Sequence, residues 1–298
     1  MAHTNEVELV TNTGWDERIL VCRNGELVYT TIVVSRRYVV IVDTMINEAT
    51  AGKLLELAQP YLGEDRTLLV VNTHADYDHC WGNQLFAEVG VPIIGRFLSV
   101  PIFSQPDSVA FLEQMRNNEP GIFGAVIPTP PTVLFDETLT IDGGDLTLEL
   151  FPTPGHTLDH LSIYIPEIST LLAADAAEVP YPVARTAAGL PAMRRSLARL
   201  AGVQAETVLY CHAPVMMGAQ LLHDNIAYFD KLEAACRAAL ERGVPADPPA
   251  GADVIALVGL PYAAAVPDGE AWQNVHGYYR SEGHTHQLRQ MLAALSGG

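Results

Sequence analysis

Four hydrophobic segments of this chain each run into side chains that can bind a metal ion. The first, residues 68–71, is Leu-Leu-Val-Val, and the hexapeptide 74–79, His-Ala-Asp-Tyr-Asp-His, follows it closely. Because a strand delivers the chain to a loop at its end, several side chains of so short a run can point into one pocket. The hexapeptide therefore predicts a metal site at the end of a strand, with a polar surface turn as the alternative.

Three later segments repeat this arrangement. The strand-like run 146–151 precedes Pro-Thr-Pro-Gly-His-Thr, which contains His156; Asp175 directly follows Leu-Leu-Ala-Ala, and His212 directly follows Val-Leu-Tyr-Cys. Loops at one rim of a sheet assemble a site in this way. Histidine and aspartate together suit borderline or hard divalent ions, and the lack of cysteine within the hexapeptide argues against a structural zinc knot.

This ordered set resembles the pattern of the metallo-β-lactamase fold superfamily: His-x-His-x-Asp-His, a distant His in a Pro-Gly-His-Thr context, an Asp and a final His. The resemblance spans about residues 20–215. It implies that a first metal is bound by His74 and His156, that a second is bound by Asp78, His79 and His212, and that Asp175 bridges the two. It also implies an α/β fold, the four-layer αββα sandwich, which the two β-rich halves of the chain independently suggest.

One position departs from the family pattern, because the second His of the hexapeptide is Asp76 here. An anionic oxygen in place of an imidazole favours a harder ion, such as iron or manganese, relative to zinc. The flavodiiron branch of the superfamily has Glu at this position, binds iron and reduces oxygen or nitric oxide, but the present chain shows no flavodoxin-like extension. Asp76 is expected either to bind the metal or to support a ligand without touching the metal.

The resemblance implies a dinuclear hydrolase with two divalent metal ions, zinc being the expected metal and iron or manganese the alternatives. A metal-activated hydroxide would attack a small ester, lactone or related substrate, while Asp78 orients the nucleophile and accepts its proton. Two other function classes stay open: a non-haem di-iron redox or oxygen-binding protein, and a metal-stabilised binding module without turnover. A purely structural site would be closed by protein ligands, which disfavours the binding module.

Charge and composition narrow the range of partners. The net charge of −18 disfavours nucleic acids and anionic membranes, so a small-molecule substrate is expected, and a homo-oligomer stays open. The first residues lack a basic segment followed by an apolar core, and no apolar run reaches the length that spans a bilayer. The four cysteines show no Cys-x-x-Cys pairing, which is consistent with reduced thiols and a cytoplasmic location.

Some residues near the predicted ligands have simpler interpretations. Cys80 and Cys211 adjoin ligands in sequence, and because neighbours usually point apart, both are expected to be buried packing residues. Asp159 and His160 either support the site or open the next strand. A basic helix is expected to include Arg185, Arg194, Arg195 and Arg199, and these arginines either bind an anionic substrate group or form a solvated face.

The periodicity of the remaining chain predicts its other elements. A hairpin is expected over 27–43, a helix over 48–59 that Asn47 caps and Pro60 stops, and a helix over 108–117 within a proline-rich excursion. Helices are also expected over 220–242 and 285–295. We expect a catalytic domain over residues 1–243 and a C-terminal helical appendage over 244–298, in which His284 and His286 are solvated.

Overall fold

The computed structural model describes residues 3–296, which fall into two compact units. The first unit contains the chain up to residue 152 together with 159–174 and 209–212; the second contains 153–158, 175–208 and the chain from 213 onward. The chain therefore passes between the units several times. The expected division at residue 243 stays a prediction.

The first unit contains a seven-stranded sheet in the order β1-β2-β3-β4-β5-β6-β7. Its strands are β1 (Glu8–Leu9), β2 (Ile19–Asn24), β3 (Val28–Val34), β4 (Tyr38–Val42), β5 (Thr67–Val71), β6 (Ile93–Arg96) and β7 (Val133–Phe135). The strands from β1 to β4 pair antiparallel, and those from β4 to β7 run parallel. The predicted hairpin is confirmed as the antiparallel pair β3 and β4.

A second sheet has the order β12-β11-β10-β9-β8. Its strands are β8 (Leu139–Asp142), β9 (Thr147–Pro152), β10 (Leu161–Ile165), β11 (Thr170–Ala174) and β12 (Thr207–Tyr210). The three hydrophobic segments that precede His156, Asp175 and His212 are therefore β9, β11 and β12, as the sequence predicted.

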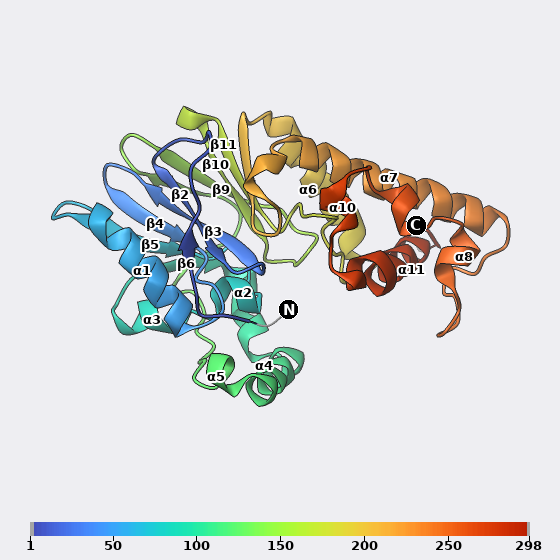
Figure 1. The fold of residues 1–298 in the computed structure, drawn as a ribbon, viewed down its shortest axis with the longest axis horizontal. Coiled ribbons are helices and arrows are strands. Elements are labelled where there is room, and N and C mark those ends of the chain that lie inside the picture. The colour runs from blue at the N-terminus through green and yellow to red at the C-terminus, as the bar shows by residue number, and fades with distance from the viewer. Residues whose placement is uncertain (1–2, 297–298) are drawn as a thin grey trace. The chain divides into compact units, whose positions relative to one another are not determined.

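Helices α1 (Glu48–Leu62) and α3 (Asn83–Glu88) pack against the seven-stranded sheet, at β4 and β6 respectively (Figure 1). Strands β2 to β6 contribute apolar side chains to the layer beneath these helices. The buried residues of this core include Ile32, Val39, Ile41, Leu54, Ala58, Val70, Phe86 and Ile93. This core fixes the positions of the strand ends that precede the candidate metal ligands.

Asn47 caps α1 as predicted. Its side chain accepts a hydrogen bond from Thr50 N at 2.9 Å, and its own backbone N–H donates to Thr50 Oγ1 at 3.2 Å. The predicted end at Pro60 is wrong, because the helix continues to Leu62. A proline in the last turn removes a single N–H donor, and this helix tolerates the loss.

Residues 97–131 leave the sheet between β6 and β7, where the prolines predict an excursion. They form the 3₁₀ helix η1 (Phe97–Ser104), α4 (Pro106–Asn118) and α5 (Pro120–Phe123). Their apolar side chains pack with those of the short helix α2 (Tyr77–Cys80) in a second, smaller core. Helix α2 contains the last three residues of the hexapeptide 74–79, so this small core supports the hexapeptide.

The second unit is built on helices. They are α6 (Gly189–Val203), α7 (Gln220–Glu241), α8 (Val254–Val258), α9 (Tyr262–Ala265), α10 (Glu270–Gln273) and α11 (His284–Ser296). Helix α7 packs against α6, α8, α9 and α11. The prediction that the basic helix includes Arg185 is wrong, because α6 begins only at Gly189 and Arg185 lies in the loop before it. In the described residues, no helix has both the length and the apolar composition needed to cross a membrane.

The prediction that His284 and His286 are solvated is wrong. The His284 ring is fully buried, with Nδ1 2.9 Å from the Tyr228 hydroxyl and Nε2 2.9 Å from the carbonyl oxygen of Leu260. His286 is half-buried, and its Nε2 lies 3.2 Å from the Ala184 carbonyl. Because α11 packs against α7, residues close to the end of the chain become part of a core.

Candidate metal centre

The hexapeptide 74–79 lies where two parallel strands end. Parallel neighbours end at the same edge of a sheet, so Asp43, directly after β4, lies beside Thr73, which follows β5. Thr73 N donates to Asp43 Oδ1 and Thr73 Oγ1 donates to Asp43 Oδ2, both at 2.7 Å. His79 Nδ1 lies 2.9 Å from the same Oδ2. The fully buried Asp43 carboxylate therefore fixes both ends of the ligand loop.

The contacts of three histidines of the predicted ligand set favour the tautomer with the hydrogen on Nδ1. In His79 this nitrogen faces the carboxylate just described, and in His212 it faces a backbone carbonyl at 2.8 Å; both partners only accept. In His74 it lies 3.0 Å from Thr73 Oγ1, whose own hydrogen is already donated. Because a neutral imidazole has one N–H, each ring keeps a lone pair on Nε2 for a metal ion.

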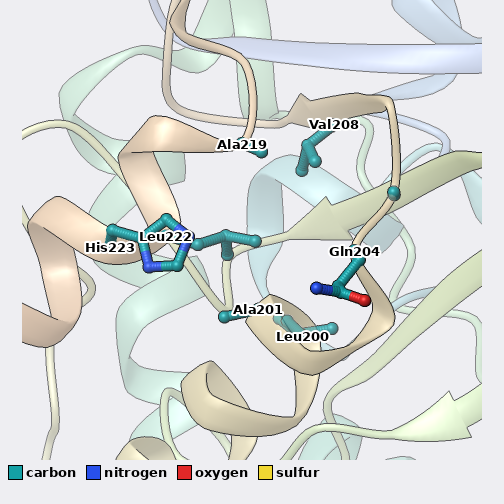
Figure 2. Close-up of a pocket in the computed structure, with 8 residues that line it drawn as sticks. Leu200, Ala201, Gln204, Val208, Ala219, Leu222 and His223 are labelled. Atoms are coloured by element: carbon teal, nitrogen blue, oxygen red, sulfur yellow. The ribbon is translucent and has the colours of Figure 1, made fainter.

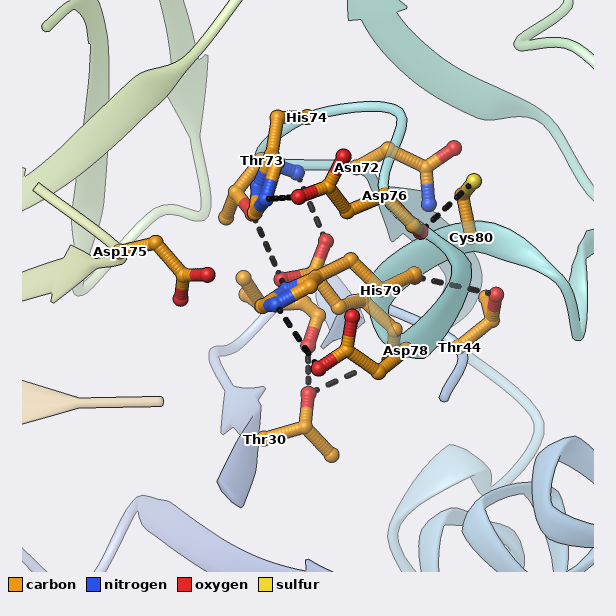
Figure 3. A network of polar contacts seen from close by, with 12 residues as sticks. Thr30, Thr44, Asn72, Thr73, His74, Asp76, Asp78, His79, Cys80 and Asp175 are labelled. Atoms are coloured by element: carbon orange, nitrogen blue, oxygen red, sulfur yellow. Dashed lines mark hydrogen bonds and ion pairs between the residues drawn. The ribbon is translucent and has the colours of Figure 1, made fainter. Parts of the chain in front are cut away.

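These Nε2 atoms face carboxylates of the hexapeptide. Asp78 Oδ2 lies 3.3 Å from His212 Nε2 and 3.9 Å from His79 Nε2, while Asp76 Oδ2 lies 3.4 Å from His74 Nε2. The rings of His74 and His79 have their centroids 4.1 Å apart, and Figure 3 shows the hexapeptide side chains gathered together. The first unit thus brings five of the seven predicted ligands into one cluster.

The other two predicted ligands, His156 and Asp175, lie together in the second unit. His156 Nε2 is 3.7 Å from Asp175 Oδ2, and its Nδ1 is 3.7 Å from Oε1 of Glu178. The three side chains offer donor atoms within 4.8 Å of one another, and both carboxylates are buried. The ring orientation resembles that of His79, with Nδ1 toward one carboxylate and Nε2 toward a carboxylate of the predicted ligand set.

The loop that carries His156 depends on its glycine. Gly155 has φ +151°, and a Cβ placed there would lie 2.4 Å from the Cα of Met193 in α6. In the same helix, the Ser196 hydroxyl donates to the carbonyl of Pro154 at 2.7 Å. The Pro-Gly-His sequence therefore lets this loop pack directly on a helix backbone, which side chains at position 155 would prevent.

Sequence reasoning missed the two carboxylates that support these histidines. Asp43 had a usable signal, because it directly follows the apolar strand β4 in the same way that Asp175 follows β11. Glu178 had none, because it lies in an irregular segment. Its backbone is held by Asn225 of α7, whose Oδ1 accepts from Glu178 N at 3.0 Å and whose Nδ2 donates to Glu178 O at 3.0 Å.

The contacts and burial of Asp159, Cys80 and Cys211 bear on the alternative roles that the sequence left open for them. Asp159 Oδ2 accepts a hydrogen bond from Ala75 N at 2.8 Å, so Asp159 supports the ligand loop. Cys80 is buried as expected; its burial and then the charge of Asp76 raise the pKa of the thiol well above its ordinary value, which opposes thiolate formation. Cys211 is buried as expected, and its Sγ lies within 4.8 Å of donor atoms of Asp43 and His79.

The donor set fits divalent metal ions. Imidazole suits zinc and iron, and carboxylates extend the range to manganese. Several carboxylates gathered in buried positions are costly unless positive charge compensates them, and bound divalent ions would supply that charge. The orientation of the rings is a second argument, because their Nδ1 contacts fix each Nε2 before a metal arrives.

A separate hollow of about 320 Å³ lies in the second unit, between the end of α6 and the start of α7 (Figure 2). Its lining residues are mainly apolar: Leu200, Ala201, Gln204, Ala205, Val208, Ala219, Leu222 and His223. None of the seven predicted ligands belongs to this lining, so the hollow is not part of the metal centre.

Comparison with known sequences points to one family. The model of the metallo-beta-lactamase superfamily matches residues 23–212. A hydroxyacylglutathione hydrolase from Hahella chejuensis is 29% identical over 204 residues, which cover 64% of this chain and 68% of that protein. A hydroxyacylglutathione hydrolase from Pseudomonas aeruginosa is 36% identical over 98 residues, which cover 31% of this chain and 38% of that protein.

Comparison with solved structures supports the same fold. A metallo-beta-lactamase family protein from Thermus thermophilus has a TM-score of 0.62 at 18% identity, covering 98% of this chain and 92% of that one. The stereoselective inverting sec-alkylsulfatase of a Pseudomonas species has a TM-score of 0.67 at 19% identity, covering 92% of this chain and 48% of that one. The predicted αββα sandwich with a C-terminal helical region is thereby confirmed.

Proposed function

Because this chain belongs to the metallo-beta-lactamase superfamily, we propose that it is a dinuclear metal-dependent hydrolase that acts on a small ester, lactone or related substrate. Family membership makes it a hydrolase, as the sequence predicted. The number of metal ions, their identity and the substrate are the proposed part. The observation that carries the proposal is the cluster in the first unit, in which three imidazole Nε2 atoms face Asp76 and Asp78.

The proposed ligands are those that the sequence predicted: His74, Asp76, Asp78, His79, His156, Asp175 and His212. Asp175 is proposed as the carboxylate shared by both ions. Two divalent ions, when bound, lower the pKa of a coordinated water toward about 7 and polarise the scissile bond. Asp43 holds the ring of His79 through a contact of 2.9 Å, and Glu178 lies 3.7 Å from Nδ1 of His156.

We assign to Asp78 the orientation of the nucleophile and the acceptance of its proton. Its carboxylate is 6% exposed and lies between two imidazoles, at 3.3 Å from His212 and 3.9 Å from His79. A carboxylate held in this way needs little rearrangement when a proton is transferred to it. Serine and cysteine nucleophiles are not required by this scheme.

Zinc is the proposed metal, with iron or manganese as alternatives. Asp76 supplies an anionic oxygen where the family pattern has an imidazole, and Glu178 adds a further carboxylate beside His156. Both features favour hard ions more than the family pattern does.

The carboxylate of Asp76 also favours one other function, that of a non-haem di-iron redox or oxygen-binding protein of this fold. Asp76 stands at the position where the iron-binding branch of the superfamily has Glu, and it faces the Nε2 atom of His74 at 3.4 Å. Two irons and a reaction with oxygen would replace hydrolysis as the main activity under this second proposal.

Proposals on substrate and location follow from the relatives and from charge. The similarity to hydroxyacylglutathione hydrolases adds thioesters to the substrates worth screening. A net charge of −18 supports a small molecule rather than a nucleic acid as the partner. A cytoplasmic location and a homo-oligomeric state are kept as proposals.

Elemental analysis of protein purified without added metal tests these proposals, together with an optical spectrum before and after exposure to oxygen. Two zincs per chain, a featureless visible spectrum and turnover in a screen of esters, thioesters, lactones and phosphodiesters are the expected results. Two irons with an oxygen-sensitive band would replace the first proposal with the second. Tight metal binding without turnover on the whole panel would refute the hydrolase proposal.

A further inference from the structure

The hollow between the end of α6 and the start of α7 is walled mainly by small and apolar side chains (Figure 2). Its apolar lining residues are Leu200, Ala201, Ala205, Val208, Ala219 and Leu222. The three alanines leave the space open, because each carries only a methyl group. An apolar cavity of about 150 Å³ holds benzene, so this hollow of about 320 Å³ has room for a body of about two fused rings.

One polar residue of the lining, Gln204, has an unusual backbone conformation. It ends α6 with φ 55° and ψ 39°, in the left-handed region that disfavours a Cβ and that glycine adopts readily. The other α-helices of residues 3–296 that end at or next to a residue with positive φ have glycine there: Gly63 for α1, Gly90 for α3, Gly243 for α7 and Gly259 for α8. Glutamine at the end of α6 therefore costs conformational energy that glycine would avoid.

The position of the Gln204 side chain accounts for this cost. It lines the hollow, and Figure 2 shows it reaching over the space from the end of α6, with His223 of α7 on another wall. In the part of the chain that the structure describes, neither side chain makes a hydrogen bond or an ion pair with another residue. A strained conformation that serves no contact within the fold indicates a role in binding. The amide and the imidazole are the two groups of the lining that can bond to a ligand.

From these observations we propose that the hollow is a second binding site, which takes a small uncharged molecule with a rigid aromatic body and an amide group. The apolar walls contact the rings, which lose less freedom on binding than a flexible chain does. The lining contains no aspartate, glutamate, lysine or arginine, so a charged ligand would lose water without gaining a counter-charge. The Gln204 amide both donates and accepts, and an amide of the ligand returns both hydrogen bonds. This site goes beyond the proposed hydrolase function and does not depend on it.

Methyl NMR spectroscopy of the full chain, labelled at its alanine, leucine and valine methyl groups, tests the proposal. The probes are 2-naphthamide, 2-acetonaphthone, which has a similar shape but no N–H donor, and 2-naphthoate, which is charged. Titration with 2-naphthamide should shift the methyl signals of the six apolar lining residues and leave those of the first-unit core, such as Leu54 and Val70, unchanged. The ketone should bind about 2- to 10-fold more weakly, because one hydrogen bond is lost, and the naphthoate should bind least.

Four variants locate the site. Ala219→Leu and Ala201→Leu fill the hollow from two half-buried positions, and each should abolish binding. Ala238→Leu is the matched control, because this exposed residue lies about 30 Å farther along α7, and it should bind as the wild type does. Gln204→Gly should weaken binding of 2-naphthamide about 2- to 10-fold. The same variant should unfold at a higher urea concentration than the wild type, because glycine relieves the backbone strain.

Unchanged lining methyl signals at the solubility limit of each probe would overturn the proposal, and so would equal binding of the three probes. The same conclusion follows if Ala238→Leu weakens binding as much as Ala219→Leu does. A Gln204→Gly protein that unfolds at a lower urea concentration would mean that Gln204 serves the fold, and the assignment of its amide to a ligand would be wrong. Because no measurement requires turnover, failure of the proposed hydrolase function leaves these outcomes unaffected.

Discussion

Asp43→Asn should weaken metal binding although Asp43 touches no metal in the proposed site. The wild-type carboxylate accepts three hydrogen bonds, from Thr73 N and Thr73 Oγ1 at 2.7 Å and from His79 Nδ1 at 2.9 Å. Asparagine has the same shape and tolerates the left-handed backbone found here, at φ 67°. Its carbonyl can replace Oδ1, but its NH₂ group then faces the two donors that Oδ2 accepted.

The expected magnitude follows from the tautomer of His79. To avoid a donor facing a donor, His79 must move its hydrogen from Nδ1 to Nε2, which is the atom that faces Asp78. Loss of a supporting carboxylate typically lowers metal affinity about 10- to 100-fold, which is about 1.4 to 2.7 kcal/mol. The metal-free protein should also lose about 1.5 to 3 kcal/mol of stability, because a charged hydrogen bond is removed from a buried position.

Competition titration with a chromophoric chelator measures the affinity, and urea unfolding of the metal-free protein measures the stability. Asp142→Asn is the matched control, because Asp142 is exposed and its carboxylate bonds surface groups, Arg37 and the Gly144 backbone. An Asp43→Asn protein that binds metal as tightly as the wild type would show that the tautomer argument is wrong. An equal loss in both variants would attribute the effect to net charge.

Four further predictions concern other parts of the site and fold. Asp175→Ala should lower metal content below two per chain by elemental analysis, and unchanged stoichiometry would refute a bridge. Asp76→His should keep two metals and shift the preference toward zinc; no change in preference or activity would mean that Asp76 does not bind metal. Gly155→Ala should cost about 3 kcal/mol in urea unfolding, because its Cβ meets the backbone of Met193 at 2.4 Å, and a wild-type midpoint would contradict this. Burial lowers the pKa of His284 below its ordinary value of 6.5, so the unfolded state binds more protons; stability present above that value should fall as pH drops through the folded-state pKa, and His284→Leu should flatten this dependence.

The candidate ligand positions could be selected from the sequence because they combine two local signals. An apolar run of strand length and a polar residue directly after it are both visible in the sequence, and each predicted strand was found. Asp43 carried the same signal, but its strand was interpreted only as half of a hairpin. The sequence therefore carried a recognisable signal for one further supporting residue, Asp43, which the prediction did not include.

The residues whose roles the sequence did not predict are positioned by contacts between distant parts of the chain. Glu178 is held by Asn225, 47 residues later, and the burial of His284 depends on Tyr228, 56 residues earlier. Neither contact leaves a periodic pattern in the sequence, because each pairs a loop or helix end with a helix far along the chain. The predicted stop at Pro60 failed for a simpler reason, since a proline near the end of a helix removes only one hydrogen bond.

The buried side chain of Gln287 in α11 exchanges two hydrogen bonds with the backbone of Ala184, and this contact has a consequence for biosynthesis. Its contact with Ala184 joins residues 103 positions apart, so the loop carrying Glu178 and Arg185 leaves the ribosome well before the helix that secures it. At about 5 to 20 residues per second, the delay is roughly 5 to 20 s. For most of that interval Asp78, His79 and His212 have already been synthesised, whereas the loop beside His156 is unsecured. The ion assigned to Asp78, His79 and His212 should therefore bind first, and the ion that needs His156 should bind only after translation has nearly ended.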